Sequence, residues 1–398
     1  MKKKFQLIAL VLASAALTFS SCKKEEQNLA SQQSATGTPD FSEKGANPDD
    51  ADLSPDALAR HTHNNYVYTE SNDAGTNHIL VYKKNANGSL TYQSSEASGG
   101  AGTGALFGSQ GALVLDKHHE WLYAVNAGDN SVSSFKVHNN GDVTLKHTEG
   151  SGGTLPVSLC VYNDLLYVVN QTSANIKGIR IGAGGSLTGI PSSIKVLSAP
   201  NADPGQISFR PNGNQIYITE RGTDKITSFH INGQGVAHNR TVNASAGVTP
   251  FGFDFARNYL VVANAHMDLP NLGGVASYSL NNSGSVNDVN GNVDNNQTAA
   301  CWTATTRYGR FAYIANSFSD NISSYYIGFN GAAYLINGAA AATGARPRDL
   351  TIVDNYYVYV LNVTDHTIGE YRRGFLGSLH SIGQVSNVPV WAAGLASY

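Results

Sequence analysis

Two glutamates, a histidine and a few arginines are the residues of this chain whose positions could support acid–base chemistry. Glu220 ends an apolar run (216–220) and is followed by Arg221, whose charge is expected to pair with the carboxylate and keep it ionised. His266 lies in an extended turn (266–274), where an imidazole could exchange protons near neutral pH. These side chains are candidates for general acid–base catalysis. The simpler alternatives are a salt bridge for Glu220 and a solvated ring for His266.

A second set of residues could bind a substrate. Arg346 and Arg348 flank Pro347, and two neighbouring guanidinium groups can hold a carboxylate or a phosphate. The alternative is that they pair with Asp349 or Asp365. Three further candidates for contacting a substrate lie near the starts of other apolar runs: Gln110, Gln206 and Trp302.

Composition excludes several classes of function. The net charge of −3 and the lack of a basic run beyond residue 24 argue against nucleic-acid binding. The sequence holds no G-x-S-x-G, P-loop, dinucleotide or H-E-x-x-H motif. Cys160 and Cys301 are expected to be buried thiols rather than ligands or nucleophiles. No cofactor is therefore expected. The alternative is a Ca²⁺-dependent hydrolase that uses Glu70, Glu220 and asparagine side chains as ligands.

An internal repeat positions these residues. A short apolar strand with the pattern Y-[VIA]-x-N recurs seven times at intervals of roughly 49 residues, near the period of propeller blades. The residues that close these strands are Glu70, Asn126, Asn170, Glu220, Asn264, Asn316 and Asn362. Asparagine bonds its own backbone and favours turns, so the five asparagines are interpreted as turn residues.

Each repeat contains four predicted strands, which is the composition of one blade of a β-propeller. The first repeat lacks its innermost strand, and the C-terminal segment Pro389–Tyr398 is an unpaired strand of the missing kind. We therefore predict an all-β protein with a single seven-bladed propeller over residues 63–398, whose C-terminal strand completes blade 1. This closure would remove free sheet edges.

The N-terminal region predicts export and a lipid anchor. Residues 1–22 read as a lipoprotein signal peptide: Lys2–Lys4, an apolar stretch too short to span a membrane, and small residues before Cys22, the predicted site of lipidation. Residues 23–62 are polar, with almost no aromatics, and are expected to form a flexible tether. We therefore expect an outer-membrane lipoprotein that faces the periplasm or the cell exterior, anchored through its N-terminal lipid.

The sequence of the repeats resembles that of the lactonase-type seven-bladed propellers. This family includes the propeller 6-phosphogluconolactonases and the carboxy-muconate lactonizing enzymes. The segments that carry the resemblance are Gly108–Val137, Ser151–Asn170, Pro204–Ile231, Thr249–Phe255 and Gln297–Trp302. The resemblance implies a propeller from about His63 to Tyr398 and a site on the face where the channel opens.

The resemblance also suggests roles for particular residues. Glu220 matches the family's strand-end glutamate, and Arg348 matches the arginine of its Pro-Arg-His segment. The histidine of that segment is replaced here by Asp349, so Glu220 or His266 would have to supply the base.

Two classes of function remain open. The first is a lactone hydrolase or lactonizing enzyme acting on a sugar or aromatic lactone, with Glu220, Arg221, His266 and Arg348 as the catalytic set. The second is a non-catalytic envelope protein that binds a glycan or another protein. In both cases we expect a monomer. Convergence of the four catalytic candidates in one pocket would favour the enzyme, and scattered positions would favour the binding module.

Overall fold

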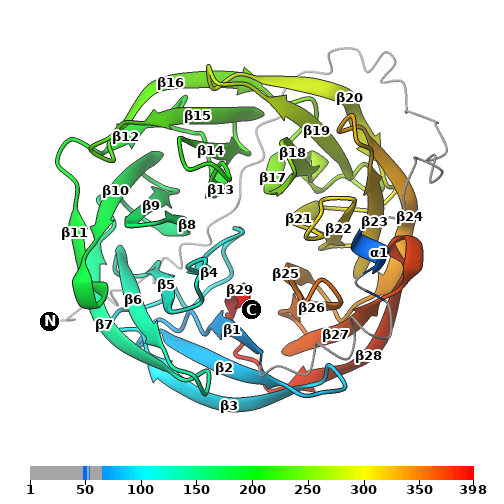
Figure 1. The fold of residues 1–398 in the computed structure, drawn as a ribbon, viewed down its shortest axis with the longest axis horizontal. Coiled ribbons are helices and arrows are strands. Elements are labelled where there is room, and N and C mark those ends of the chain that lie inside the picture. Colours follow the sequence, from blue (N-terminus) through cyan, green and yellow to red (C-terminus); the bar gives the residue numbers. More distant parts are fainter. Residues whose placement is uncertain (1–47, 52, 54–64) are drawn as a thin grey trace, which may run out of the picture. The chain divides into compact units, whose positions relative to one another are not determined.

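The computed structural model describes residues 48–51, 53 and 65–398. Over residues 65–398 the chain forms a ring of seven antiparallel sheets around a central channel, six with four strands and one with five (Figure 1). The predicted all-β, seven-bladed propeller is confirmed. The predicted signal peptide and most of the predicted tether, including Cys22, lie outside the described residues.

The blades follow one another along the chain. Within each blade the strands are named below in order from the channel to the outer edge. Blade 1 comprises β29 (Ala393–Ser397), β1 (Tyr66–Glu70), β2 (His78–Lys84) and β3 (Leu90–Ala97). Blade 2 comprises β4 (Leu113–Leu115), β5 (Trp121–Asn126), β6 (Ser131–Val137) and β7 (Val143–Gly150). Blade 3 comprises β8 (Pro156–Tyr162), β9 (Leu165–Asn170), β10 (Asn175–Ile181) and β11 (Leu187–Gly189), and its fifth strand β12 (Lys195–Val196) also pairs with β10.

The remaining blades repeat this order. Blade 4 comprises β13 (Pro204–Phe209), β14 (Gln215–Glu220), β15 (Lys225–Ile231) and β16 (Ala237–Ala244). Blade 5 comprises β17 (Pro250–Ala256), β18 (Tyr259–Asn264), β19 (Gly274–Leu280) and β20 (Val286–Asp294). Blade 6 comprises β21 (Ala300–Thr305), β22 (Phe311–Asn316), β23 (Asn321–Ile327) and β24 (Ala333–Ala342). Blade 7 comprises β25 (Pro347–Val353), β26 (Tyr357–Asn362), β27 (Thr367–Arg373) and β28 (Leu379–Ser386).

Short helical segments complete the described chain. They are α1 (Pro48–Ala51) and three single turns, η1 (Ala183–Gly185), η2 (His266–Asp268) and η3 (Phe375–Gly377). None of the helices among the described residues is long and apolar enough to cross a membrane.

The C-terminal strand closes the ring as predicted. β29 lies against β1 in antiparallel register, with Val67 opposite Ser397 and Tyr68 opposite Ala396. The strand itself covers Ala393–Ser397, about half of the predicted segment. Blade 1 is thus built from both ends of the propeller, so the ring cannot close until the whole chain is present.

The repeated tyrosine of the Y-[VIA]-x-N pattern ties one blade to the next. Its ring is buried, and in three blades its hydroxyl donates to a backbone carbonyl in a turn of the following blade. These bonds are Tyr68 to Gly141 (2.9 Å), Tyr167 to Gly235 (2.6 Å) and Tyr359 to Gly88 (2.7 Å). All three acceptor glycines have φ between +79° and +88°, a conformation that strongly favours glycine. The repeat therefore encodes contacts between blades.

The repeated asparagine closes its own hairpin. Asn126 donates to Ser131 Oγ (3.0 Å) and Ser133 Oγ (2.8 Å), five and seven residues further on. Asn316 makes the same pair of contacts with Asn321 and Ser323. The asparagines are therefore the last residues of their strands rather than turn residues, and Asn126 and Asn316 bond side chains across the hairpin instead of their own backbone.

A short N-terminal segment is held against blades 6 and 7. Asp49 of α1 is fully buried, and its carboxylate accepts from Thr306 Oγ1 (2.6 Å), from Tyr308 N (3.1 Å) and from Asn355 Nδ2 (3.0 Å). Arg373 also donates to the Asp49 carbonyl oxygen. This segment falls within the range predicted as a tether, so the described part of that range has a fixed attachment.

Candidate functional site

Glu220 lies inside blade 4 rather than at the channel. Its side chain is fully buried and accepts from Ser198 N (3.1 Å) and from the hydroxyls of Ser198, Thr223 (2.7 Å) and Thr227 (2.6 Å). Thr227 occupies the position that Ser133 has beside Asn126, so Glu220 takes the place of the hairpin-closing asparagine. Because the Glu220 carboxylate is fully buried, it cannot contact a substrate in this structure. The structure therefore offers no support for the predicted role of Glu220 as a base.

Arg221 points away from Glu220 and toward the channel. The expected Glu220–Arg221 pair is not formed, because Arg221 Nη2 instead donates to Asp203 Oδ1 (2.7 Å). The guanidinium group also stacks over the Phe251 ring at 4.7 Å. Both contacts hold it at the end of the channel where the innermost strands of blades 4 and 5 begin.

Arg348 and Arg346 reach the same end of the channel from blade 7. Arg348 Nη1 donates to Phe107 O (3.0 Å), while its Nε is buried without a partner among the described residues. Burial lowers the pKa of Arg348, and the nearby Arg346 and Arg221 add to this effect; the group nevertheless stays charged. Arg346 is exposed and lies over the Phe318 ring at 4.8 Å. The charges of Arg346 and Arg221 thus both act on Arg348.

Asp268, which is exposed, supplies a second carboxylate at this opening, in addition to the Asp203 carboxylate that pairs with Arg221. Partial desolvation raises its pKa, and the positive charges of Arg221, Arg348 and Arg346 oppose that rise. One acidic group therefore lies within electrostatic range of all three arginines. We call Arg221, Asp268, Arg346 and Arg348 the mouth cluster.

Asp268 is held by an unusual backbone turn. His266, Met267 and Asp268 of η2 have φ of 53°, 55° and 57°, so three consecutive non-glycine residues are left-handed. Each such residue costs on the order of 1–2 kcal/mol. Two hydrogen bonds stabilise the turn: His266 N donates to Val248 O (3.1 Å), and Met267 N donates to Thr249 Oγ1 (3.1 Å). Strain of this kind often accompanies a functional site.

His266 shares this turn with Asp268. Its side chain is partly exposed, and its Nδ1 has no partner among the described residues. The predicted position of His266 over the channel face thus remains compatible with proton transfer, and its role stays a prediction.

The loop before β4 contacts Arg348 of the mouth cluster, whose Nη1 donates to Phe107 O. We call residues 101–112 the channel loop; Figure 1 shows it extending into the centre of the ring. Gln110 Nε2 donates to Thr303 O (2.6 Å), and Thr303 N donates back to Gln110 Oε1 (3.0 Å), which connects blade 2 to blade 6. Trp302 Nε1 donates to Ser109 O (2.7 Å). Gln110 and Trp302, both predicted to contact substrate, instead hold the channel loop in place through these hydrogen bonds.

Side chains also connect neighbouring innermost strands. Gln206 Oε1 accepts from Phe253 N (2.6 Å), and Asp349 Oδ2 accepts from Leu395 N (3.0 Å). Gln206, another predicted substrate contact, is therefore engaged between blades 4 and 5. Asp349 connects blade 7 to the C-terminal strand, and it does not pair with Arg348.

Asp349 makes stability depend on pH. Burial raises its pKa to about 7, above the usual value of 3.8. Since the folded state holds this proton more tightly than the unfolded state, its stabilising effect is complete below about pH 4 and is lost as pH rises through about 7. We expect Asp349→Asn to remove on the order of a few kcal/mol of this pH dependence. Denaturant unfolding at several pH values tests this expectation, and parallel profiles for both proteins would contradict it.

The remaining sequence candidates do not form a second centre. Glu70 is buried, and burial raises its pKa well above the usual range. Cys160 and Cys301 are free and buried, as expected. Among the residues that the structure describes, no group of three or more His, Cys, Asp or Glu side chains is placed to hold a metal ion. The Ca²⁺-dependent alternative stays a prediction.

The sequence did not reveal two members of the site. Asp203 lies in the loop just before Pro204. Asp268 lies in a turn with a left-handed backbone, but that turn contains no glycine that would have indicated this conformation in the sequence. The only available signal was their position in the repeat: Asp203 directly precedes β13, and Asp268 follows β18.

Together these features define a class of protein: a seven-bladed propeller with a cluster of charged side chains where its channel opens. The model of the family described as "Lactonase, 7-bladed beta-propeller" matches residues 58–201 and 197–299. The chain belongs to this family. No curated protein matches the sequence.

Solved structures share the fold at low identity. A candidate 6-phosphogluconolactonase of Bacteroides uniformis matches with a TM-score of 0.70 and 17% identity over 83% of this chain and 99% of its own. A similar candidate from Bacteroides fragilis gives 0.69 and 19%, over 84% and 98%. The periplasmic gluconolactonase of Pseudomonas aeruginosa gives 0.67 and 15%, over 84% and 98%. At these identities the likeness establishes the fold alone.

Proposed function

We propose that the protein hydrolyses a lactone that carries a negative charge, at the mouth cluster. The observation that supports this most directly is that two arginines reach the channel loop: Arg348 Nη1 donates to Phe107 O (3.0 Å), and Arg221 Nη1 lies beside Gly108. Asp268 lies within electrostatic range of both arginines, and Arg346 lies within electrostatic range of Arg348. Arginines in a partly desolvated site bind carboxylate or phosphate well. Of the predicted catalytic set, Arg221 and Arg348 meet there, whereas Glu220 does not.

Hydrolysis needs a base and a group that stabilises the oxyanion. Asp268 would take a proton from a water molecule as that water attacks the lactone carbonyl carbon. One arginine would stabilise the negative charge that develops on the carbonyl oxygen, and another would hold the anionic substituent. The ring C–O bond then breaks, the ring oxygen takes the proton that Asp268 removed from the water, and the new carboxylic acid releases its proton to solvent as the hydroxy-carboxylate leaves.

The pH dependence follows from the same groups. Asp268 acts as a base only when it is ionised, and desolvation raises its pKa above the usual value despite the arginines. Activity should therefore fall as pH drops through this raised pKa.

The substrate class follows from location as well as chemistry. The signal peptide and Cys22 predicted from the sequence would place the propeller outside the cytoplasm. A sugar or aromatic lactone with a carboxylate would suit that compartment better than a phosphorylated metabolic intermediate.

A panel of lactones tests the proposal. Proton release would be followed with the full chain on neutral aldonolactones, phosphoaldonolactones and carboxylated aromatic lactones. Turnover that favours the anionic compounds is expected. If neutral lactones turn over equally well, or no lactone turns over at all, the proposal fails.

A further inference from the structure

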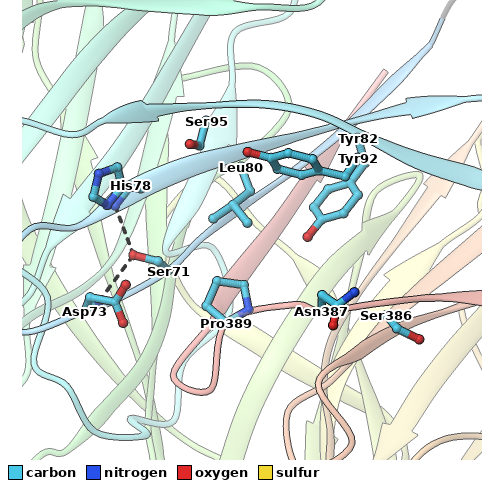
Figure 2. Close-up of a pocket in the computed structure, with 10 residues that line it drawn as sticks. All are labelled: Ser71, Asp73, His78, Leu80, Tyr82, Tyr92, Ser95, Ser386, Asn387 and Pro389. Carbon is cyan, nitrogen blue, oxygen red and sulfur yellow. Dashed lines mark hydrogen bonds between the residues drawn. The ribbon is translucent and has the colours of Figure 1, made fainter.

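A groove lies between blades 1 and 7, lined by residues distinct from the mouth cluster. Its volume is about 450 Å³, within the range of small-molecule sites. It is lined by residues of the turn after β1, of β2 and β3, and of the end of β28 and the segment that follows it: Ser71, Asp73, His78, Leu80, Tyr82, Tyr92, Ser95, Ser386, Asn387 and Pro389 (Figure 2). We call it the blade 1–7 groove.

The groove has an apolar floor and an aromatic wall. Leu80 is nearly buried, and Pro389 lies across from it. Tyr82 and Tyr92 pack edge to face with their ring centroids 5.8 Å apart. Tyr92 is 50% exposed, so part of its ring remains free for contact.

The rim carries polar side chains that the fold does not use. Across the described residues, no side-chain hydrogen bond is made by Asp73, Ser95, Ser386 or Asn387. This contrasts with the repeated asparagines, whose amides close hairpins. Figure 2 shows Asp73 at one end of the groove and Ser386 and Asn387 at the other, with Ser95 above.

A buried hydroxyl at the wall also lacks a partner. Tyr82 is 1% exposed, and its hydroxyl makes no hydrogen bond within the described structure. In Figure 2 the phenol groups of both tyrosines point toward other labelled residues that line the groove. A buried polar group left unpaired destabilises the folded state, and a hydrogen bond to a ligand hydroxyl would remove this penalty.

These features select one chemical class. None of the lining residues is Lys or Arg, so the groove does not suit an anion. A purely apolar ligand would leave the rim and the Tyr82 hydroxyl unpaired. A neutral sugar presents an apolar face of C–H groups together with hydroxyls that donate and accept. We propose that the blade 1–7 groove is a binding site for a neutral oligosaccharide, separate from the lactone site.

In this arrangement one sugar ring lies against the exposed face of Tyr92. Asp73 accepts hydrogen bonds from sugar hydroxyls, and Asn387 both donates and accepts. A small shift of the exposed Tyr92 ring opens the Tyr82 hydroxyl to the ligand.

Binding to three probes tests the site: cellotetraose, maltotetraose and laminaritetraose, titrated into the full chain by calorimetry. At least one is expected to bind with a Kd of about 0.1–1 mM. Tyr92→Ala should weaken that binding about tenfold. The control is Tyr308→Ala, which removes a 40% exposed tyrosine from blade 6 and should leave binding unchanged.

Tyr82→Phe separates a binding role from a structural one. Removing the unpaired hydroxyl should raise the melting temperature of the free protein, yet weaken sugar binding about three- to tenfold. Binding that survives both Tyr82→Phe and Tyr92→Ala would overturn the proposal. So would the absence of binding by all three sugars at about 10 mM.

Discussion

Removal of Pro389–Tyr398 is expected to leave the chain unable to form a stable monomer. The segment supplies β29, the innermost strand of blade 1, and Leu395 N donates to Asp349 of blade 7. Tyr398 also stacks on His119 of blade 2, with ring centroids 4.8 Å apart. These ten residues therefore connect three blades.

The loss should exceed the net stability of a typical domain, about 5–15 kcal/mol. It would also expose the edge of β1 to pairing with other chains. Soluble yield, circular dichroism and light scattering of the truncated chain measure the effect. Deletion of Tyr398 alone is the control, because it keeps β29 and should cost much less. A monomeric truncated protein with an unchanged melting temperature would show that the ring does not depend on this strand.

Asp268→Asn is expected to remove turnover while keeping the substrate bound. If Asp268 is the base, its loss should lower kcat by about 10²–10⁴-fold. The same change removes a negative charge that competes for the three arginines, so an anionic substrate should bind as well or better. A purely structural role would instead weaken binding together with turnover.

Steady-state kinetics and titration with an unreactive carboxylated lactam measure the two effects separately. Asp288→Asn, an exposed carboxyl on the outer strand of the same blade, is the matched control. Turnover that survives in Asp268→Asn would move the base elsewhere, with His266 as the next candidate.

The fold could be predicted because the repeat encodes it several times. The buried tyrosine that bonds the next blade and the asparagine that closes the hairpin give a pattern visible without a structure. The unpaired C-terminal strand then follows from counting strands. The bounds of β29 could not be predicted, since its pairing partner is more than 300 residues away.

The site was only partly predictable. Arg221, Arg346 and Arg348 could be placed at the channel from their positions in the repeat. Glu220 was placed in the wrong surroundings: a strand-end glutamate can replace asparagine when threonines donate to it, as Thr223 and Thr227 do. Asp268 could not be predicted, because its position depends on a left-handed turn that arises from tertiary contacts.

The central claim is that the mouth cluster selects anionic lactones. The most direct test is the ratio of kcat/KM for a carboxylated lactone to that for its methyl ester, in the wild type and in Arg346→Ala. Arg372→Ala, an exposed arginine on the same blade, is the control. The wild type and the control should favour the carboxylate by about tenfold or more, and Arg346→Ala should bring the ratio close to one. Equal turnover of acid and ester by the wild type, or a ratio that Arg346→Ala leaves unchanged, would contradict the account.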